Sequence, residues 1–418
     1  MKYLISGYYG EGNAGDEAIL AGILQEVARR DEGAQFTVLS FDPADTARRH
    51  GGGRIALEVS STSLRSAGRL RALMRRSDLL ISGGGSFLHE ADFALHGRSF
   101  LFREGKLRPI PYFLSVVYLA RSAGLPVMWY AQGLGPLHTA AARRLVADAG
   151  SSAQAVTWRD RDSADLAYEV GVRARVQRVV PDPAYALVPS RPEEASGLLA
   201  RYGLPPGRPF LAVCPRPWLG RSGIEEGLGR ALEQIVERRD VTVVLVPFHE
   251  SQDPPLCESL AARPALAGRA LSLPPVASSR MLAAVLGRAQ LVLSMRLHSG
   301  ILATTAGTPS VVLDYDPKTK AFASQTGQLP WAVPVDSLDG SGLDHLDPGL
   351  PEVASSPSGA HGVSALLAAV EDSLDHLPDR RRALIHAAAP LRAEAGRTAQ
   401  LAVQLASTGG VASPGVKG

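Results

Sequence analysis

Arg296 and His298 stand two residues apart and combine a fixed positive charge with an imidazole that titrates near neutral pH. An apolar stretch, residues 291–293, precedes them and predicts a buried strand. Small residues at 299–306 follow and predict a helix that ends at Gly307. Ligands of open α/β sheets bind at the carboxyl ends of strands, and helix N-termini attract anions. The pair therefore indicates an anion site; the alternative is that Arg296 forms a structural ion pair and His298 caps the helix.

Further polar residues follow other expected strands in the second half of the chain. Lys318 comes after an apolar stretch and is expected on a loop, and Arg216 follows another such stretch. His249 and Asp253 follow a third. Because the carboxyl ends of parallel strands meet at one edge of a sheet, we expect these side chains to lie near Arg296.

Three glycine-rich loops follow strands in the first half of the chain, at residues 10–15, 82–90 and 130–136. Glycine lets the backbone approach a ligand because it has no Cβ and accepts positive φ. The alternatives are tight turns without a ligand and a structural helix cap at Asn13. The candidate contacts to the hydroxyl groups of an acceptor are Asn13, Asp16, Gly84, Gly85, His89 and Gln132.

The first of these loops fits the G-x-G-x-x-G pattern of dinucleotide-binding proteins. We reject that function because Asp16 and Glu17 fall in the first helical turn, where they would repel a pyrophosphate. The acidic residue expected about 20 positions later is matched only loosely by Asp42.

Arg159 ends a further strand and is expected at the same sheet edge as Gln132. It lies in the segment Trp-Arg-Asp-Arg-Asp-Ser, whose last residue, Ser163, is placed to cap the next helix. Two interpretations fit this segment, a ligand contact through Arg159 and a solvated run of ion pairs.

Strands and helices alternate along two stretches of the chain, which predicts an α/β fold with two parallel, doubly wound sheets. We expect an N-terminal Rossmann-like domain at 1–190 on the acceptor side and a second one at 205–340 on the donor side. C-terminal helices are expected at 363–408, kinked or split at Pro390, before a flexible tail at 409–418. Two such domains facing across a cleft resemble the GT-B architecture of many glycosyltransferases.

The composition argues against several classes of protein. With 44 basic and 41 acidic residues, the net charge of +3 disfavours a nucleic-acid protein held by bulk charge. The two cysteines, and the lack of metal-ligand spacings, give no basis for a metal site. No apolar run reaches the length of a membrane span, so we expect a cytoplasmic protein. The basic, amphipathic segment 63–76 suits contact with an anionic membrane surface, or else it is a solvated helix covering the sheet.

Taken in order, the motifs are similar to those of the polysaccharide pyruvyl transferase family. The closest resemblance is to its CsaB type, which modifies secondary cell-wall polymers for S-layer attachment, and it runs from residue 1 to about 330. One departure is His89-Glu90, where the family more often has Gln-Asp. The motifs that carry the resemblance are Gly7-Tyr-Tyr-Gly-x-Gly-Asn-x-Gly-Asp-Glu-Ala18, Gly83-Gly-Gly-Ser86, Gln132-Gly-Leu-Gly-Pro136, Arg159-Asp-x-x-Ser163, Asp182-Pro183 and Arg296-Leu-His-Ser-Gly300.

The resemblance implies an enzyme on a GT-B-like fold that uses phosphoenolpyruvate as co-substrate, with no further cofactor. Its product is a cyclic pyruvyl ketal on a saccharide, here expected to be lipid-linked, so that peripheral contact with the membrane also follows. His298, Arg296 and Lys318 are the catalytic residues so implied, with His298 as general acid or base. The expected donor contacts are Arg159, Arg216, Arg296, Leu297, Ser299, Gly300 and Lys318.

Two other functions fit the same residues. A GT-B glycosyltransferase would hold the diphosphate of a nucleotide sugar with Arg296 and Lys318. A non-catalytic sugar-binding protein would bind a saccharide, release no phosphate, and keep its affinity when His298 is replaced. Labelled phosphoenolpyruvate and a labelled nucleotide sugar, each with an acceptor, distinguish these functions.

Overall fold

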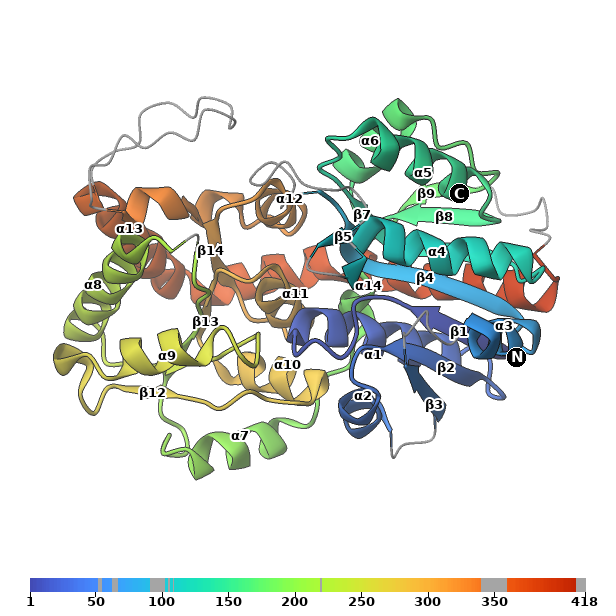
Figure 1. Ribbon diagram of the computed structural model, residues 1–418. Helices are drawn as coiled ribbons and strands as arrows, with labels where there is room; N and C mark the ends of the chain where they lie inside the picture. The colour runs from blue at the N-terminus through green and yellow to red at the C-terminus, as the bar shows by residue number, and fades with distance from the viewer. Residues whose placement is uncertain are drawn as a thin grey trace. The chain divides into compact units, whose positions relative to one another are not determined.

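A computed structural model of the chain describes residues 1–51, 55–61, 67–90, 102–103, 106–107, 109–218, 220–339 and 359–410. It contains two compact units (Figure 1). Unit 1 consists of Met1–Leu187 together with Leu391–Gly418, and unit 2 consists of Val188–Pro390. Of the expected C-terminal tail, residues 411–418 lie outside the described residues.

The core of unit 1 is a seven-stranded sheet in the order β3-β2-β1-β4-β7-β8-β9 with every pair parallel. Runs of Val, Ile and Leu form its central strands, as is typical of sheets buried on both faces. The strands are β1 (Lys2–Ser6), β2 (Gln35–Ser40), β3 (Ala56–Ser61), β4 (Leu79–Leu88), β7 (Val127–Leu134), β8 (Ala155–Trp158) and β9 (Gln177–Val179). A separate antiparallel pair joins β5 (Phe102–Arg103) to β6 (Lys106–Leu107).

Neighbouring residues of the unit 1 strands enter two different cores, because side chains alternate across a strand. Leu4 and Leu80 join apolar residues of α3 to α6, whereas Ile5 and Ile81 join those of α1 and the end of α14. The helices are α1 (Ala14–Ala28), α2 (Pro43–His50), α3 (Ala67–Arg75), α4 (Pro109–Ser122), α5 (Ala140–Ser151) and α6 (Arg161–Val170), followed by the 3₁₀ turn η2 (Pro183–Ala186).

Unit 2 has a six-stranded parallel sheet in the order β12-β11-β10-β13-β14-β15. Its strands are β10 (Phe210–Cys214), β11 (Thr242–Leu245), β12 (Ala270–Ser272), β13 (Leu291–Ser294), β14 (Ser310–Asp314) and β15 (Ala332–Pro334). Its helices are α7 (Pro192–Arg201), α8 (Ser222–Arg238), α9 (Pro254–Ala261), α10 (Ser279–Arg288), α11 (Leu297–Thr305) and α12 (Pro317–Gln325), with 3₁₀ turns η3 (Pro264–Leu266), η4 (Leu329–Trp331) and η5 (Val335–Leu338).

Two helices end the described chain. Residues of α13 (Gly359–Asp375) belong to the core of unit 2, together with α8 and α9. The helix α14 (Leu377–Ser407) is not split at Pro390, which lies inside it, and its last turns contribute to a core of unit 1.

The predicted fold class, two α/β units with parallel sheets, is confirmed. Local details differ from expectation. The helix α12 begins at Pro317, where a loop was predicted, so Lys318 lies in a first helical turn. Ser163 does not cap α6: the Asp160 carboxylate accepts from the Ser163 N–H at 2.8 Å, and the Ser163 hydroxyl accepts from the Leu134 N–H at 2.9 Å.

In each sheet the order in which the strands are added reverses at one point, between two central strands. In unit 1 the chain proceeds outwards from β1 to β2 and β3, and from β4 to β7, β8 and β9 on the other side. In unit 2 the corresponding neighbours are β10 and β13. At such a point the two connections leave in opposite directions and open a crevice outside the carboxyl ends of the strands. The ends of these four strands and the segments after them therefore position many of the candidate site residues. Gln132 lies in β7, Arg159 follows β8 and Lys318 follows β14.

Candidate active site

Arg296, the N-cap residue of α11, is clamped by a buried carboxylate. Its Nε donates to Asp253 Oδ2 at 3.2 Å, and its Nη2 donates to Oδ1. The Asp253 side chain is 0% exposed and that of Arg296 is 11% exposed. The same Oδ2 accepts from the main-chain N–H groups of Phe248 and His249, each at 2.9 Å. The ion pair that the sequence left as an alternative for Arg296 is thus present, and it ties the end of β13 to the segment after β11.

Arg216, which follows β10, is held by aromatic rings. Its guanidinium carbon lies 5.1 Å from the ring centre of Trp218 and 5.2 Å from that of Tyr315, and Nη1 donates to the Tyr315 hydroxyl at 3.0 Å. Its buried Nε has no hydrogen-bond partner within the described residues. Over those same residues, Arg216 also has no carboxylate within ion-pair distance. It therefore presents an uncompensated positive charge at the edge where β10 and β13 end.

Lys318 lies in the first turn of α12, next to the carboxylate that caps this helix. Asp316 accepts from the Lys318 N–H at 3.0 Å, and the Lys318 ammonium group lies 3.1 Å from Asp316 Oδ2. Both side chains are about one-third exposed, at 31% and 32%. The ion pair is accordingly accessible to solvent, and an incoming anion can compete for the ammonium group.

The remaining residues of the 296–300 motif form the start of α11. His298 is half-buried in the first helical turn. The Ser299 hydroxyl is buried and donates to the Arg296 carbonyl at 2.6 Å, so it serves the turn itself. A Cβ on Gly300 would lie 2.5 Å from the ring of Phe322 in α12, so the glycine permits the two helices to pack closely.

A second imidazole, His249, stands at the same edge. It is half-buried and follows β11. Burial and the nearby charge of Arg296, with a smaller contribution from Arg216, hold the pKa of His249 below its usual value, against the opposing effects of Asp253 and Glu250. The imidazole is consequently neutral at pH 7.

In unit 1 the residues after β1 form a cap for α1. The Asn13 side chain accepts from the Gly15 N–H at 3.0 Å and donates to Asp16 Oδ2 at 2.6 Å. Asp16 and Gly85 lie close together, because a Cβ on Gly85 would meet Asp16 Oδ1 at 3.0 Å. The structure thus brings the first glycine-rich loop next to Gly85, with Asn13 serving as the N-cap. Gly84 and Gly85 lie within β4, not in a loop as predicted for residues 82–90, because the strand continues to Leu88.

The other glycine-rich segments are joined through Gln132. Its Nε2 donates to the carbonyl groups of Gly85 at 3.0 Å and Gly133 at 2.8 Å, and its side chain is fully buried. Arg159 donates to the Ser86 hydroxyl at 2.6 Å and lies 3.4 Å from Asp160. Gln132, Arg159 and the end of β4 therefore form one hydrogen-bonded group in unit 1.

The segment around His89 is anchored by its neighbour. The buried carboxylate of Glu90 accepts from the N–H groups of His138 at 2.6 Å and Thr139 at 2.8 Å, and from the Thr139 hydroxyl at 2.7 Å. These contacts assign Glu90 to the start of α5. His89 itself is half-buried.

Sequence reasoning missed one buried pair in this region. His50 Nε2 lies 2.6 Å from Glu17 Oε2, and Glu17 Oε1 accepts from the Gly10 N–H at 2.8 Å. Both side chains are almost inaccessible, at 6% and 1%. His50 ends the unexpected helix α2, so no local pattern connected it with the first glycine-rich loop.

The sequence model described as polysaccharide pyruvyl transferase matches residues 13–317. The chain belongs to the polysaccharide pyruvyl transferase family. Membership of this family makes it a transferase that acts on a polysaccharide. No curated protein sequence matches the chain.

Solved structures with similar folds span nearly the whole chain at low identity. Anabaena HepE in complex with UDP-glucose is 14% identical, with a TM-score of 0.56 over 98% of this chain and 100% of that one. UDP-GlcNAc 2-epimerase from Neisseria meningitidis bound to UDP-GlcNAc is 10% identical, with a TM-score of 0.59 over 95% and 98%. A glycosyltransferase from Rickettsia africae is 11% identical, with a TM-score of 0.59 over 98% of each chain. These similarities confirm a GT-B-like fold for this member of the family.

The family match, residues 13–317, includes candidate residues of both units and ends one residue before Lys318. Unit 2 contains Arg216, Arg296, Leu297, His298, Ser299, Gly300 and Lys318. Unit 1 contains Asn13, Asp16, Gly84, Gly85, His89, Gln132 and Arg159. Of the expected donor contacts, only Arg159 therefore belongs to unit 1.

Proposed function

We propose that the protein transfers a pyruvyl group from phosphoenolpyruvate to two hydroxyl groups of one sugar, forming a cyclic ketal and releasing phosphate. The acceptor is a cell-wall polysaccharide or its lipid-linked precursor, as in the CsaB type that the motifs resemble. Membership of the polysaccharide pyruvyl transferase family supports the reaction class. The choice of donor depends on the cations of unit 2.

The environment of Arg216 is the observation that supports phosphoenolpyruvate as the donor. Phosphoenolpyruvate has a phosphate and a carboxylate, so its site needs more positive charge than ion-paired arginines supply. Asp253 already neutralises Arg296, whereas the rings of Trp218 and Tyr315 support Arg216 without neutralising it. Lys318, with its solvent-accessible ion pair, and the N-terminus of α11 add further attraction for an anion.

The reaction balances with two hydroxyl groups and one donor. The methylene carbon of the donor gains a proton and becomes a methyl group. One sugar hydroxyl forms a bond to C2, the C2–O bond to phosphate breaks, and a second hydroxyl then bonds to C2. The two hydroxyl protons are accounted for by the new methyl group and by the released phosphate. His298 suits one of these proton transfers, because a neutral imidazole accepts a proton and an imidazolium donates one.

The test is a turnover assay with labelled phosphoenolpyruvate and a saccharide acceptor. We expect phosphate release that depends on the acceptor, and a ketal in the product by mass spectrometry. His298→Gln is expected to lower kcat by about 10²–10⁴-fold, the usual contribution of general acid–base catalysis. His386→Gln, an exposed histidine of α14, is the matched control and should keep wild-type turnover.

Two results would contradict the proposal. Nucleotide release from a nucleotide sugar, without phosphate release from phosphoenolpyruvate, would favour the glycosyltransferase alternative. Near-normal turnover of His298→Gln would remove this residue from the mechanism.

A lipid-linked acceptor places the protein at the inner face of the membrane, and α3 suits that position. Its residues Arg69, Arg71 and Arg75, with Arg76 directly after it, are exposed, whereas its apolar residues face the core of unit 1. None of the described helices is long and apolar enough to cross a membrane. Contact would therefore be electrostatic and peripheral.

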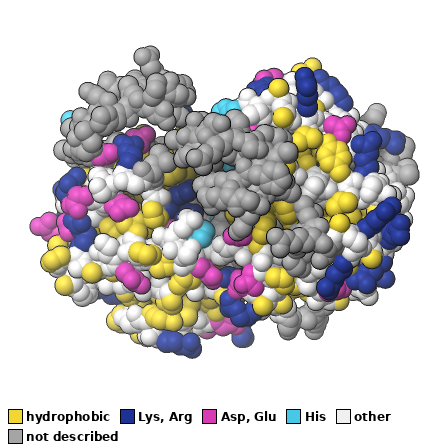
Figure 2. Space-filling model, in the orientation of Figure 1, with side chains coloured by type: hydrophobic (Ala, Val, Ile, Leu, Met, Phe, Trp, Pro, Cys, Tyr) yellow, Lys and Arg dark blue, Asp and Glu magenta, His cyan; other side chains and the backbone are white. Residues whose placement is uncertain are grey.

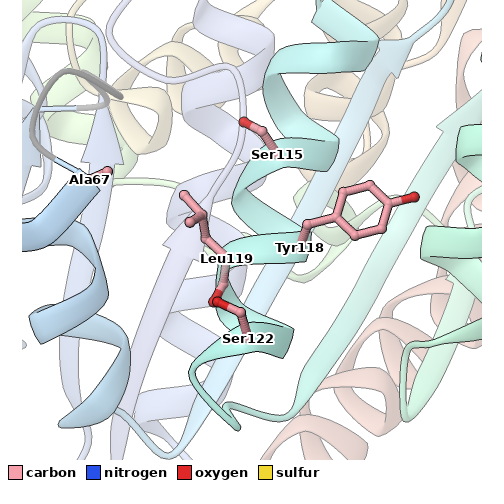
Figure 3. A pocket seen from close by; sticks show the side chains of 5 residues that line it. All are labelled: Ala67, Ser115, Tyr118, Leu119 and Ser122. Carbon is pink, nitrogen blue, oxygen red and sulfur yellow. The ribbon is translucent and has the colours of Figure 1, made fainter.

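A hollow of about 410 Å³ lies beside α3, against α4 (Figure 3). The Ser115 hydroxyl donates to the Tyr112 carbonyl and the Ser122 hydroxyl to the Leu119 carbonyl. The hydroxyl of Tyr118 points away from the hollow and is hydrogen-bonded to Asp148. Burial, and to a smaller extent this hydrogen bond, raises the pKa of Tyr118 to about 12. Because these hydroxyl groups are engaged elsewhere, the hollow suits an apolar chain better than a saccharide.

A further inference from the structure

The main chain of His249 is fixed to the carboxylate that holds Arg296. Its N–H donates to Asp253 Oδ2 at 2.9 Å, and Arg296 Nε donates to the same oxygen at 3.2 Å. A single buried atom therefore links the imidazole-bearing segment after β11 to the guanidinium after β13. The position of His249 relative to the candidate donor site is thus built into the fold of unit 2.

The ring of His249 has a defined orientation towards its own loop. Nδ1 lies 3.4 Å from the main-chain nitrogen of Ser251 and 3.4 Å from its hydroxyl oxygen. A main-chain N–H can only donate, so Nδ1 acts as the acceptor and the proton of the neutral ring is assigned to Nε2. Protonation at Nδ1 requires this loop to give up that contact, a cost that a new negative charge beside the imidazolium offsets.

Charged groups from three segments act on this ring. The loop of His249 itself contributes Glu250 and Asp253, the segment after β13 contributes Arg296, and the segment after β10 contributes Arg216. The two arginines and burial disfavour the imidazolium, whereas the two carboxylates favour it. An anion that binds the arginines cancels their effect and adds its own negative charge.

We propose that His249 takes up a proton when the phosphate-bearing donor binds beside Arg216 and Arg296. The imidazolium then becomes a further cationic contact for the donor, formed only in the complex. This inference rests on the proposed function for the identity of the donor, but not for the behaviour of the imidazole. Any doubly charged phosphate bound at these arginines produces the same protonation.

The sign of the pH dependence follows from proton linkage. If binding takes up a proton, affinity falls as the pH rises, by at most about tenfold per pH unit for one proton. The pKa of His249 in the free protein lies below its usual value, so the uptake is measurable above pH 7, where the free imidazole is neutral. A phosphate monoester is almost fully ionised at pH 8 and has little proton of its own to exchange.

The experiment is calorimetric titration of the full chain with phosphoenolpyruvate, and separately with inorganic phosphate, between pH 7 and 8.5. Repeating each titration in two buffers of different ionisation enthalpy gives the number of protons taken up. We expect uptake by the wild-type protein and by His386→Gln, the control variant. In His249→Gln we expect no uptake and a dissociation constant that varies little with pH. His298→Gln is expected to retain the uptake.

Each outcome decides the inference. Unchanged proton uptake in His249→Gln, or its loss in His298→Gln instead, would overturn it, as would binding of the donor by the wild type without uptake. If phosphoenolpyruvate fails to bind but inorganic phosphate binds with uptake that depends on His249, the inference stands and the proposed donor is wrong. If neither anion binds, both are wrong.

Discussion

At the scale of single residues, the pairing of Arg296 with Asp253 determines how a mutation must be interpreted. Replacing Arg296 alone leaves a fully buried carboxylate without its counter-ion. Breaking a buried ion pair in this way typically costs about 3–5 kcal/mol of stability. Loss of activity in Arg296→Gln would then mix two causes, a weakened fold and a missing cation.

A double-mutant cycle separates these two causes. We expect Arg296→Gln and Asp253→Asn each to lower the free energy of unfolding, measured in urea. The double variant should lose less than the sum of both, with a coupling of about 1–3 kcal/mol, since neither charge then remains buried alone. Turnover should stay abolished in the double variant if the guanidinium acts on the donor. Activity restored together with stability would show that Arg296 is structural.

Asp253 also illustrates that contacts between residues at the ends of different strands depend on the order of the strands in the sheet. The sequence placed Arg216, His249, Asp253 and Arg296 after expected strands, but could not assign a partner to any of them. The partner follows from the order of the strands, which brings the segments after β11 and β13 to either side of β10. Pairing across neighbouring strands is a property of topology, and spacing along the chain does not encode it.

At the scale of elements, the close approach of α1 to β4 depends on Gly84. This residue has φ +79°, and a Cβ on it would lie 2.1 Å from Ile19 Cγ2 in α1. Both the backbone conformation and the overlap disfavour any side chain. The helix whose N-cap is Asn13 therefore packs against the glycine-containing part of β4.

We predict that Gly84→Ala destabilises the protein by about 2–4 kcal/mol, from an unfavourable φ together with overpacking. Gly124→Ala is the matched control, because Gly124 has φ +74° but no atom within 4 Å of its added Cβ. Urea unfolding of the two variants measures the difference between them, which is the cost of the overlap alone. Equal losses of stability would mean that α1 moves away at no cost.

Much of the element order could be predicted from sequence, because apolar runs and glycines mark buried strands and their ends. Apolar runs of this kind form the strands Lys2–Ser6, Gln35–Ser40 and Phe210–Cys214. The helix Pro43–His50 was missed because it has few apolar residues and buries mainly Thr46. The sequence predicts a loop from Pro317 because proline and aspartate are common in turns, but the same residues also suit the first turn of a helix, which is what forms.

The candidate site was predicted in its parts but not in its contacts. Spacing identified Arg296 and Lys318 as cations at strand ends, and the structure places both there. The sequence spacing gave no indication that Trp218 and Tyr315 would flank Arg216, because aromatic residues 97 positions apart form no recognisable sequence pattern. Contacts between distant segments require the sheet to be assembled first.

At the scale of the whole molecule, a small net charge coexists with local clusters of positively charged side chains. The net charge is only +3, yet Arg69, Arg71, Arg75 and Arg76 form one exposed group on and directly after α3. Among the described residues, the first three lack an ion-pair partner, and Arg76 lies 3.6 Å from Glu58. Lys and Arg side chains gather on the side of unit 1 where α3 lies (Figure 2). A membrane would respond to this group rather than to the total charge.

We predict that the protein binds vesicles containing phosphatidylglycerol and not vesicles of phosphatidylcholine alone. Each arginine near an anionic surface contributes about 1 kcal/mol, so the four together contribute roughly 4 kcal/mol, close to a thousandfold in partitioning. Binding measured by co-sedimentation should weaken steeply with added salt, because exposed charges are screened. Replacing all four arginines by glutamate is expected to abolish it.

The control variant must change the net charge equally without altering α3. Replacing Arg161, Arg191, Arg382 and Arg397 by glutamate meets this condition, since all four are more than half exposed and lie on other elements. If both variants lose vesicle binding alike, total charge is responsible and α3 has no special role. If only the α3 variant loses it, while its turnover of a water-soluble acceptor is unchanged, the arginines on and directly after α3 position the enzyme at the membrane, apart from its chemistry.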